Sequence, residues 1–339
     1  MLSLENQDRR ELYKSYAEYS GEDRARVEAQ TAGSPYLPKY HIHPQSGILN
    51  DPNGFSFYNG LWRLFYQAFP FGAVHGAKSW AAVVSRDLVR WEYRGLALLP
   101  DTPFDSHGVF SGSALAHEDK LLLFYTGNVR TENRERRSYQ ICAAMDQNGD
   151  IKKQLPPFIG DLPKGYTAHF RDPQVFAHDG EYRLLLGAQN EALQGKILVY
   201  KSRDMKDWQL SGELRFSGQT MGYMIECPNL VFINGRPILI FCPQGLEQSV
   251  APYANITGWR EQRGDTVRKS KVSTRRDMVL NIFVDRSVFE IFINKGEKSI
   301  TGRFFPQNGK DKIFITAAAL HPGIKIQGSV WGMEASVRA

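Results

Sequence analysis

Hydrophobic and polar residues alternate with a period of two along most of the chain, and short turn-forming pairs interrupt the alternation at close intervals. Between about residues 40 and 245 the apolar runs are short and rich in β-branched and aromatic side chains, which is typical of strands. Asn59-Gly60, Asp179-Gly180 and Asn234-Gly235 separate successive runs, and such pairs favour two-residue hairpin turns. The pattern therefore predicts an all-β protein built from antiparallel hairpins.

The predicted strands fall into repeated units. The first unit contains strands at 42–49, 62–66 and 79–84, and it ends in the segment Ser-Arg-Asp-Leu-Val-Arg-Trp at 85–91. The third unit ends in Ser-Arg-Asp-Met-Lys-Asp-Trp at 202–208, which repeats the same Ser-Arg-Asp-x-x-x-Trp pattern. A β-sandwich with coincidental strand spacing does not account for this repeat, so the sequence favours the radial repetition of a β-propeller.

One polar residue recurs at the same phase of each unit. Asp51, Ser111, Asp172 and Glu226 follow one another at intervals of 60, 61 and 54 residues. In a propeller the innermost strand of every blade faces the central channel, so equivalent positions of successive blades converge there. The sequence thus predicts four blades whose polar residues meet in one funnel, with Asp51 in a turn after the first strand. Several carboxyl groups gathered in a funnel are typical of glycosidases.

The two ends of the chain carry different patterns. Residues 9–30 have a helix-forming composition and predict a short leading helix. The segments 279–285, 287–294 and 299–305 alternate sharply, with a turn at Asp285-Arg286, but they lack the phase of the blades. They predict part of a small antiparallel sandwich packed on the propeller.

The 339 residues are enough for one large domain and a smaller appendage. No run of about eighteen apolar residues occurs, and residues 1–30 are charged rather than apolar, so the sequence predicts neither a membrane helix nor a secretory segment. We expect a cytoplasmic protein. The net charge of +6 comes from basic residues that are scattered or interleaved with acids, which favours a solvated surface over nucleic-acid binding. Such a positive field would assist the approach of an anionic sugar phosphate.

Cysteine and histidine spacing predicts no metal site. Cys142, Cys227 and Cys242 are odd in number and lack ligand spacing, so we expect free thiols in a reducing compartment and no disulfide. His41 and His43 alternate on one face of the first predicted strand, but no third ligand shares their phase. Ordinary strand histidines therefore explain them better than a bound metal does.

Five short motifs stand at the predicted funnel. They are Leu49-Asn50-Asp51-Pro52-Asn53-Gly54, Phe65-Tyr66-Gln67, Phe110-Ser111-Gly112-Ser113, Phe170-Arg171-Asp172-Pro173 and Glu226-Cys227-Pro228. In order and spacing they closely resemble the signatures of glycoside hydrolase family 32, the β-fructofuranosidases that include invertases, levanases and sucrose-6-phosphate hydrolases. Residues 66–76 and 242–246 are most similar to the bacterial sucrose-6-phosphate hydrolase branch, and residues 282–292 are similar to the family's C-terminal sandwich module.

The resemblance implies a five-bladed propeller followed by a β-sandwich, but it is interrupted after about residue 256. Only four blades are legible, and the fifth is largely missing. Either a deletion has joined two pieces of the family fold, which we favour, or the residues after 278 close the ring. A four-bladed remnant would expose the edges of blades one and four. The predicted organisation has four parts: an N-terminal helical lead (1–34), an incomplete propeller catalytic domain (35–256), an irregular junction (257–277) and a sandwich remnant (278–339).

The resemblance implies roles for four charged residues. Asp51 matches the nucleophile, Glu226 the acid/base, and Asp172 a stabiliser of the transition state that Arg171 orients. On its own the Asp51 motif is explained by turn chemistry, and the other motifs in register reverse that interpretation. Glu226 stands on an otherwise apolar strand, so its carboxyl must be paired, protonated or functional.

The remaining candidates would bind the substrate. Neutral side chains would hydrogen-bond the fructosyl hydroxyls and other side chains would wall the pocket: Asn50, Gln67 and Ser111 for the first role, Phe110, Trp80 and His75 for the second. Trp80 is as compatible with the hydrophobic core as with the wall. His75 and Lys78 are candidates for binding a substrate phosphate, because both lie in the connection that follows the Phe-Tyr-Gln motif.

These expectations together describe a retaining β-fructofuranosidase that cleaves sucrose 6-phosphate or sucrose by double displacement, with a small sugar as its partner and no cofactor. Another propeller glycosidase, acting on arabinan or xylan, is the alternative enzyme, and the motifs at 50–54 and 226–228 speak against it. A non-catalytic or weakly active carbohydrate-binding remnant is the alternative from another class, and the missing fifth blade supports it.

Overall fold

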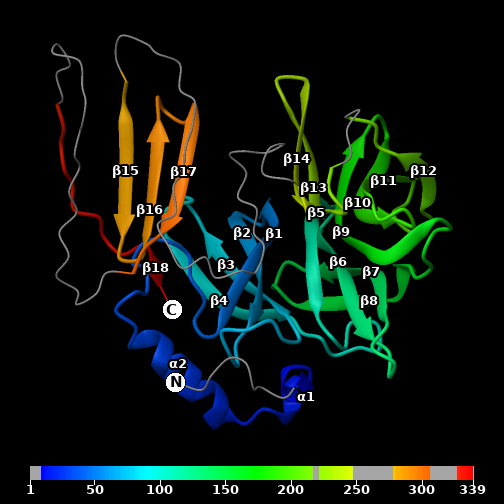
Figure 1. Ribbon diagram of the computed structural model, residues 1–339, viewed down its shortest axis with the longest axis horizontal. Coiled ribbons are helices and arrows are strands. Elements are labelled where there is room, and N and C mark those ends of the chain that lie inside the picture. The colour runs from blue at the N-terminus through cyan, green and yellow to red at the C-terminus, as the bar shows by residue number, and fades with distance from the viewer. Residues whose placement is uncertain (1–8, 217–220, 247–277, 306–326, 339) are drawn as a thin grey trace.

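The computed structural model describes residues 9–216, 221–246, 278–305 and 327–338, and strands dominate it (Figure 1). Apart from one short strand near the end of the described chain, each sheet is antiparallel and is completed before the next begins, so neighbours in a sheet are neighbours in sequence. This order is that of propeller blades, and the prediction of an all-β, propeller-type fold is confirmed. Among the described helices, none is long and apolar enough to cross a membrane.

Three of the sheets contain the four consecutive strands of a complete blade. Blade one contains β1 (Ile48–Tyr58), β2 (Leu61–Phe69), β3 (Ser79–Ser85) and β4 (Trp91–Leu98). Blade two contains β5 (Val109–His117), β6 (Lys120–Arg130), β7 (Arg136–Met145) and β8 (Ile151–Ile159). Blade three contains β9 (Tyr166–His178), β10 (Glu181–Asn190), β11 (Gly195–Ser202) and β12 (Gln209–Glu213).

The fourth blade is a single hairpin in the part of the chain that the structure describes, with β13 (Met224–Ile233) and β14 (Arg236–Gln244). A separate sheet follows, with β15 (Leu280–Asp285), β16 (Val288–Ile293) and β17 (Lys298–Arg303). In Figure 1 blade one lies between this sheet and the β13–β14 hairpin. The described strands β15, β16 and β17 therefore form a sheet of their own and do not close the ring. The junction predicted at 257–277 lies outside the described residues.

The predicted hairpin turns are confirmed by their backbone angles. Both residues of Asn59-Gly60, Asp179-Gly180 and Asn234-Gly235 have positive φ, with values between 50° and 75°. A two-residue turn of type I′ requires positive φ at both central positions, and its twist matches that of the flanking strands. These local pairs set the register of β1–β2, β9–β10 and β13–β14.

The repeated Ser-Arg-Asp-x-x-x-Trp segment forms the same hydrogen-bonded turn twice. In the first copy the Ser85 hydroxyl accepts a hydrogen bond from the Leu88 N–H (2.9 Å), and Leu88 has a φ of 63°. The Trp91 indole N–H donates to the Leu88 carbonyl (3.2 Å), which closes the turn. Residues 202–208 form the equivalent bonds. In each copy the turn joins the third strand of a blade to its outermost strand.

The strand predicted at 42–49 is wrong. The first strand begins at Ile48 and continues through Asp51, so Asp51 lies in β1 and not in a turn. The segment before it is held by the sandwich: the backbone N–H groups of residues 39–41 all donate to the Asp285 carboxylate, at 2.7–3.0 Å. The N–H groups of residues 39–41 are therefore bonded to Asp285 and cannot pair with a neighbouring strand just before the predicted one.

His41 contributes to the same link between propeller and sandwich. Its Nδ1 lies 2.9 Å from Asp285 Oδ2 and its Nε2 lies 3.1 Å from Glu290 Oε2. Ser287 adds a further bond, because its hydroxyl donates to the Tyr36 carbonyl (2.7 Å). His41 thus joins two parts of the fold, and the prediction that it faces one side of a strand together with His43 is wrong.

The leading helix predicted at 9–30 is divided into three short segments: α1 (Arg9–Leu12), η2 (Tyr16–Glu18) and α2 (Gly21–Ala32). Ser15 and Ser20 divide them, because each is an N-cap with a complete capping box that starts a new helix. Leu12 and Tyr16 fasten this lead to the β2–β3 connection: the Ala77 N–H donates to the Leu12 carbonyl (2.7 Å), and the Tyr16 hydroxyl donates to the Ala77 carbonyl (2.8 Å).

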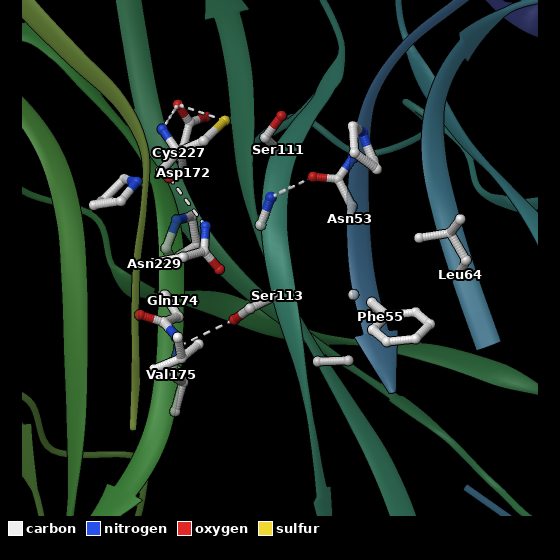
Figure 2. Close-up of a pocket in the computed structure, with 17 residues that line it drawn as sticks. Asn53, Phe55, Leu64, Ser111, Ser113, Asp172, Gln174, Val175, Cys227 and Asn229 are labelled. Atoms are coloured by element: carbon white, nitrogen blue, oxygen red, sulfur yellow. Dashed lines mark hydrogen bonds between the residues drawn. The ribbon is translucent and has the colours of Figure 1, made fainter. Parts of the chain in front are cut away.

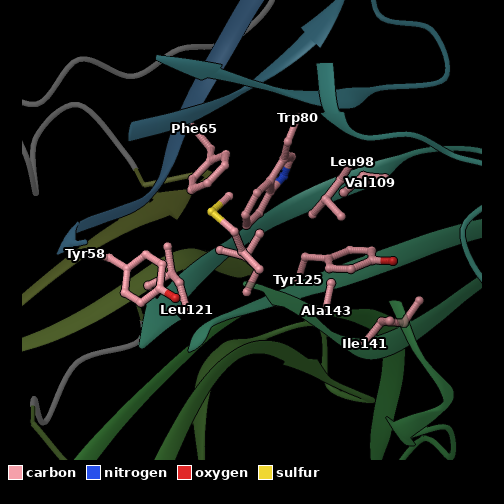
Figure 3. Packing of buried hydrophobic residues seen from close by; sticks show 11 residues of the cluster. Tyr58, Phe65, Trp80, Leu98, Val109, Leu121, Tyr125, Ile141 and Ala143 are labelled. Atoms are coloured by element: carbon pink, nitrogen blue, oxygen red, sulfur yellow. The ribbon is translucent and has the colours of Figure 1, made fainter. Parts of the chain in front are cut away.

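Hydrophobic seams join consecutive blades. Figure 3 shows the seam between blades one and two, where Phe65 and Trp80 face Leu121 and Tyr125. A similar cluster lies between blades two and three. The seam between blades three and four is smaller, with Leu185, Ile197 and Ile225 as its fully buried members.

Blades one and four carry exposed apolar side chains. Phe55 and Phe57 on β1 are 56% and 54% exposed, and Ile238 and Ile240 on β14 are 41% and 57% exposed. These strands belong to the two blades that a fifth blade would separate. Four large apolar side chains on them therefore contact water.

A short strand that the sequence did not predict completes blade one. β18 (Val337–Arg338) pairs in parallel with β4, and the preceding Ser336 carbonyl accepts a hydrogen bond from the Trp91 N–H (2.8 Å). The Ser336 N–H donates to the Lys39 carbonyl (3.2 Å). The outer edge of blade one is covered in this way, which removes an unpaired strand edge from the surface.

Candidate active site

The four periodic polar residues all lie on inner strands: Asp51, Ser111 and Asp172 lie within a break in the strand pairing, and Glu226 is the last paired residue before one. Register shifts fall between Leu49 and Pro52 in β1, between Val109 and Gly112 in β5, between Arg171 and Gln174 in β9, and between Glu226 and Asn229 in β13. A bulge bends a strand and re-aims one side chain, and such bulges are common beside functional sites. The recurring phase in the sequence therefore corresponds to a recurring irregularity in the sheets.

Hydrogen bonds also join each inner strand to the next, and we call them the inter-blade contacts. In each contact a backbone N–H of the later blade donates to a side chain of the earlier one. The three contacts are Gly112 N–H to Asn53 Oδ1 (2.9 Å), Val175 N–H to Ser113 Oγ (3.0 Å) and Leu230 N–H to Gln174 Oε1 (2.6 Å). Figure 2 shows the first two of them across the channel. They hold the inner strands at a constant spacing around the site.

Asp51 is held by a network of neutral side chains. Its Oδ2 accepts a hydrogen bond from the Ser111 hydroxyl (2.8 Å) and its Oδ1 accepts one from Asn50 Nδ2 (2.9 Å). Gln67 joins the two donors, because its Nε2 donates to Ser111 Oγ (2.7 Å) and its Oε1 accepts from Asn50 Nδ2 (3.3 Å). The structure thus brings these four predicted residues together, and it leaves the Asp51 carboxylate fixed in orientation.

Glu226 is paired, which is one of the three states expected for a carboxyl on that strand. Its Oε1 accepts from Arg171 Nη2 (2.7 Å) and more weakly from Nε (3.3 Å), and its Oε2 accepts from Gln244 Nε2 (2.6 Å). The Glu226 side chain remains 31% exposed, whereas that of Arg171 is 7% exposed. The Glu226 carboxylate is therefore held in place by the buried Arg171 and is still accessible to solvent.

Asp172 is almost fully buried among charged groups. Burial raises the pKa of its carboxyl to about 7; Arg171 acts to lower it, while Glu226 and Asp51 act to raise it further. Its Oδ2 accepts a hydrogen bond from the Cys227 N–H (3.0 Å), and the Cys227 sulfur lies 3.7 Å away. Asp172 and Cys227 both have left-handed backbones, with φ of 67° and 49°. Such strain is found where a side chain must point in one direction.

Lys78 and His75 both interact electrostatically with carboxyl groups of the site. Burial lowers the pKa of Lys78, and Asp51, Asp172 and Glu226 act to raise it. Burial also lowers the pKa of His75, to about 4, and Lys78 lowers it further. Lys78 is therefore a buried cation within electrostatic reach of all three carboxyl groups, and His75 is neutral near pH 7.

Trp80 belongs to the hydrophobic core and not to the wall of the pocket. Its side chain is fully buried between blades one and two, and its indole N–H donates to the Phe110 carbonyl (3.0 Å). The Phe110 ring is partly exposed and lies 5.7 Å from Lys78 Nζ. Trp80 thus holds the Phe110 backbone from within the core. Of the two roles expected for Trp80, the core is therefore right and the pocket wall is wrong.

A cavity of about 410 Å³ runs along the inner strands past the carboxyl cluster. Figure 2 shows Ser111 and Asp172 at one end of it and Phe55 and Val175 towards the other. Residues of all four inner strands line the cavity, and of the four periodic polar residues Ser111 and Asp172 are among them. Its dimensions are those of a site for a small molecule.

The sequence did not identify Gln244, His169 and Arg136 as members of this site. Gln244 lies in the 242–246 segment, and its contact with Glu226 Oε2 arises because β14 pairs with β13. His169 accepts from Arg171 Nη1 at 3.0 Å and lies 3.3 Å from Arg136 Nη1. Arg136 comes from another blade, so only the alignment of blades two and three reveals this group.

The model of the family described as glycosyl hydrolases family 32, N-terminal domain, matches residues 41–285. The chain belongs to glycosyl hydrolase family 32. The model of the family's C-terminal region matches residues 247–328, so the chain matches the models of both parts of the family fold. The resemblance seen in the five motifs is confirmed.

Curated family 32 relatives are similar over the propeller. A sucrose-6-phosphate hydrolase of Pediococcus pentosaceus is 50% identical over 249 residues, which cover 74% of this chain and 50% of that protein. A sucrose-6-phosphate hydrolase of Lactococcus lactis subsp. lactis is 49% identical over 249 residues, which cover 73% of this chain and 53% of that protein. The chain thus spans about half the length of the curated relatives that it matches.

Solved family 32 structures share the fold. The sucrose-6-phosphate hydrolase from Lactobacillus gasseri aligns with a TM-score of 0.72 and 50% identity, over 74% of this chain and 51% of that one. A β-fructofuranosidase from Bombyx mori, solved as a mutant in complex with sucrose, aligns with a TM-score of 0.62 and 36% identity, over 69% of this chain and 50% of that one. Both likenesses support the propeller assignment of the described blades.

Proposed function

We propose that this chain is a β-fructofuranosidase that cleaves sucrose 6-phosphate, and sucrose less well, with retention of configuration. One observation carries the proposal: Asp51 and Glu226 both interact electrostatically with the buried Asp172 carboxyl, and all three residues lie at or beside the bulges of inner strands. Two carboxyl groups that flank the scissile bond are the requirement of a glycosidase. The names of the family 32 relatives supply the sugar.

In the first step Asp51 attacks the anomeric carbon of the fructosyl group, and the bond to the glycosidic oxygen breaks. Glu226 donates its proton to that oxygen, so the glucosyl half leaves as an alcohol. Ser111 and Asn50 hold the Asp51 oxygens during the attack. In the second step Glu226 removes a proton from water, the water attacks the same carbon, and the Asp51 carboxylate is released.

Asp172 would accept hydrogen bonds from fructosyl hydroxyls while positive charge develops on the sugar ring. Arg171 would orient Glu226 through its two hydrogen bonds and would balance the charge of Asp172. Gln67, Phe110 and His75 would complete the sugar pocket. Glu226 gives one proton and takes one back, and Asp51 forms and releases the covalent bond, so the proposed reaction uses no cofactor.

Domain boundaries and location are part of the proposal. Residues 35–256 would form the catalytic unit, 1–34 its helical support and 278–339 the sandwich remnant, with 257–277 as their junction. Three free cysteines support a reducing compartment, and we propose the cytoplasm.

The second candidate function is a sugar-binding remnant without activity. It is favoured by one observation, which is that the fourth blade contains two strands in the described residues and leaves exposed apolar side chains beside the channel. Such a chain would bind fructosides through the same cavity but would not release fructose.

The test is fructose release from sucrose 6-phosphate and from sucrose, with Asp51→Asn as the inactive control. Hydrolysis that depends on Asp51 supports the enzyme, and a folded chain that binds sucrose without releasing fructose supports the remnant. Reaction in methanol separates retention from inversion, because retention forms the methyl β-fructofuranoside and inversion forms the α anomer. Release of sugar from arabinan or xylan instead would reject the assignment.

A further inference from the structure

Two arginines face each other across the β6–β7 hairpin, beside the carboxyl cluster. Arg130 is the last residue of β6 and is the cross-strand partner of Arg136, the first residue of β7. Like charges directly opposite each other destabilise a strand pair. Among the described residues neither guanidinium has a carboxylate partner: Arg130 donates to the Arg134 carbonyl, and Arg136 lies 3.3 Å from His169 Nδ1. The pair therefore carries two positive charges without a carboxylate in contact among the described residues, although Glu226 acts on Arg136 from a distance.

A chain of contacts links this pair to Glu226. His169 Nδ1 lies 3.3 Å from Arg136 Nη1 and 3.0 Å from Arg171 Nη1, and Arg171 Nη2 lies 2.7 Å from Glu226 Oε1. Because both guanidinium groups are donors, His169 Nδ1 must be an acceptor and the ring proton must be on Nε2. Burial, together with Arg136, Arg171 and Arg130, lowers the pKa of His169 to about 4, so this histidine adds no positive charge near pH 7.

The place of this pair matches the half of the substrate that leaves. Glu226 protonates the glycosidic oxygen in the proposed reaction, so the glucosyl half lies on the side of Glu226 and Arg171. The 6-position of that sugar is carried on C5, which is joined to the glycosidic carbon through the ring oxygen. His169 and Arg171 separate Arg136 from Glu226, and both Arg130 and Arg136 are half-buried at strand ends. A substituent at the 6-position would therefore extend towards these two arginines.

We propose that Arg136, assisted by Arg130, binds the phosphoryl group at the 6-position of the glucosyl half of the substrate. This inference rests on the proposed function and names the residues that select a phosphorylated sugar. A phosphoryl group carries about −1.5 to −2 charges at pH 7, which matches the two unneutralised guanidinium groups. The guanidinium fork also pairs with two phosphoryl oxygens at once, which an ammonium does not do.

This site differs from the one expected from the sequence, which was His75 and Lys78. The charge of Lys78 is opposed by Asp51, Asp172 and Glu226, so little of it remains for an anion. Burial lowers the pKa of His75 to about 4, which leaves a neutral ring. The cations without a carboxylate in contact are therefore Arg130 and Arg136, and Arg136 is connected to Glu226 through His169 and Arg171.

The experiment compares the specificity of Arg136→Gln with that of Arg137→Gln. Arg137 is the next residue of β7 and is exposed, so it is a matched control for the loss of one charge. In Arg136→Gln the loss of kcat/KM on sucrose 6-phosphate should exceed the loss on sucrose by about 10- to 100-fold, mostly through KM. Arg137→Gln should leave the ratio of the two substrates as it is. Equal losses on both sugars would overturn the proposal, because Arg136 would then act through His169 and Arg171 on Glu226.

A binding measurement separates this proposal from the proposed function. Calorimetry with glucose 6-phosphate and with glucose needs no turnover, and the intact chain should bind the phosphorylated sugar more tightly by a similar factor. Arg136→Gln should remove that difference and Arg137→Gln should keep it. If no sugar is hydrolysed but this pattern holds, the proposed reaction is wrong and the phosphate site stands. If the intact chain binds both sugars equally, the phosphate site is wrong whatever the activity.

Discussion

The buried Asp285 carboxylate joins the sandwich to the propeller, and Asp285→Asn should loosen that joint. The carboxylate accepts the N–H groups of residues 39–41 and the His41 ring, all within 3.0 Å. Asparagine keeps the shape, but it has no charge and presents an NH2 group where one oxygen accepted hydrogen bonds. At least one backbone N–H of residues 39–41 then faces another donor.

The size of the effect follows from burial. The Asp285 side chain is 1% exposed, and breaking a buried charged pair costs about 3–5 kcal/mol. For a unit of about 150–250 residues each kcal/mol lowers Tm by roughly 2–4 °C, so a decrease of roughly 6–20 °C is expected. Glu290→Gln is the matched control, because Glu290 contacts the same imidazole but is 28% exposed, and it should cost about 1 kcal/mol or less.

Hydrogen exchange gives the sharpest assay of this joint. The amides of residues 39–41 should be protected in the intact chain and in Glu290→Gln, and they should exchange much faster in Asp285→Asn. Thermal melts of the three proteins measure the accompanying loss of stability. Unchanged protection in Asp285→Asn, or equal melts for the two variants, would refute the argument that this carboxylate holds the segment.

The joint should also resist acid. Burial acts to raise the pKa of Asp285, but the backbone donors of Lys39, Tyr40 and His41 and the His41 ring bring it below its usual value of 3.8. A lowered folded pKa means that the contribution is complete above 3.8 and is lost as the pH falls through the lower, folded value. The difference in stability between the intact chain and Asp285→Asn should therefore persist to pH 4 and shrink only below it.

Three further predictions concern the site and the blades. Asp172→Asn should abolish fructose release but raise the free energy of unfolding by about 0.5–2 kcal/mol above pH 7. Because the pKa of Asp172 is raised from 3.8 to about 7 in the folded chain, its contribution to stability is complete below pH 3.8 and is lost as the pH rises through 7. Melts at pH 5 should therefore show a smaller gain for the variant than melts at pH 8. Ser111→Ala removes a donor to Asp51 and leaves Gln67 Nε2 without its acceptor, so kcat/KM on sucrose should fall about 10- to 100-fold and urea melts should show a loss of about 1–3 kcal/mol. Ser85→Ala and Ser202→Ala remove the same turn bonds in two blades and should each cost about 1–2 kcal/mol in urea melts; an effect in one blade only would contradict the equivalence of the two turns.

Local chemistry predicted the features that depend on a few neighbouring residues. The Asn59-Gly60, Asp179-Gly180 and Asn234-Gly235 turns were predicted because each pair tolerates positive φ without help from the rest of the fold. The repeated Ser-Arg-Asp turn was visible because its bonds lie within seven residues, at 85–91 and 202–208. The phase of the inner strands was visible because blades of similar length repeat similar intervals, which are 60, 61 and 54 residues.

Contacts between distant segments explain what the sequence did not predict. The stretch at 42–49 alternates like a strand, but its predecessor is held by Asp285, over 240 residues away in the chain. Asp51 sits in a bulge because β1 pairs with β2 on both sides of it, which turn chemistry alone does not predict. Arg136 joins the site only because blade two stands beside blade three.

The inter-blade contacts also imply an order of assembly. In each of them the newer blade donates a backbone N–H to a side chain that the older blade already presents, so blade one can form before blade two has been synthesised. Growth from the ribosome would then proceed blade by blade, and it could stop after any blade without breaking an earlier contact. Asn229 occupies the next position in this series, and in the described part of the chain its side chain bonds only back to the Cys227 carbonyl. It is the point at which another blade would be added, so a chain of this kind can lose a late blade and still build the early ones.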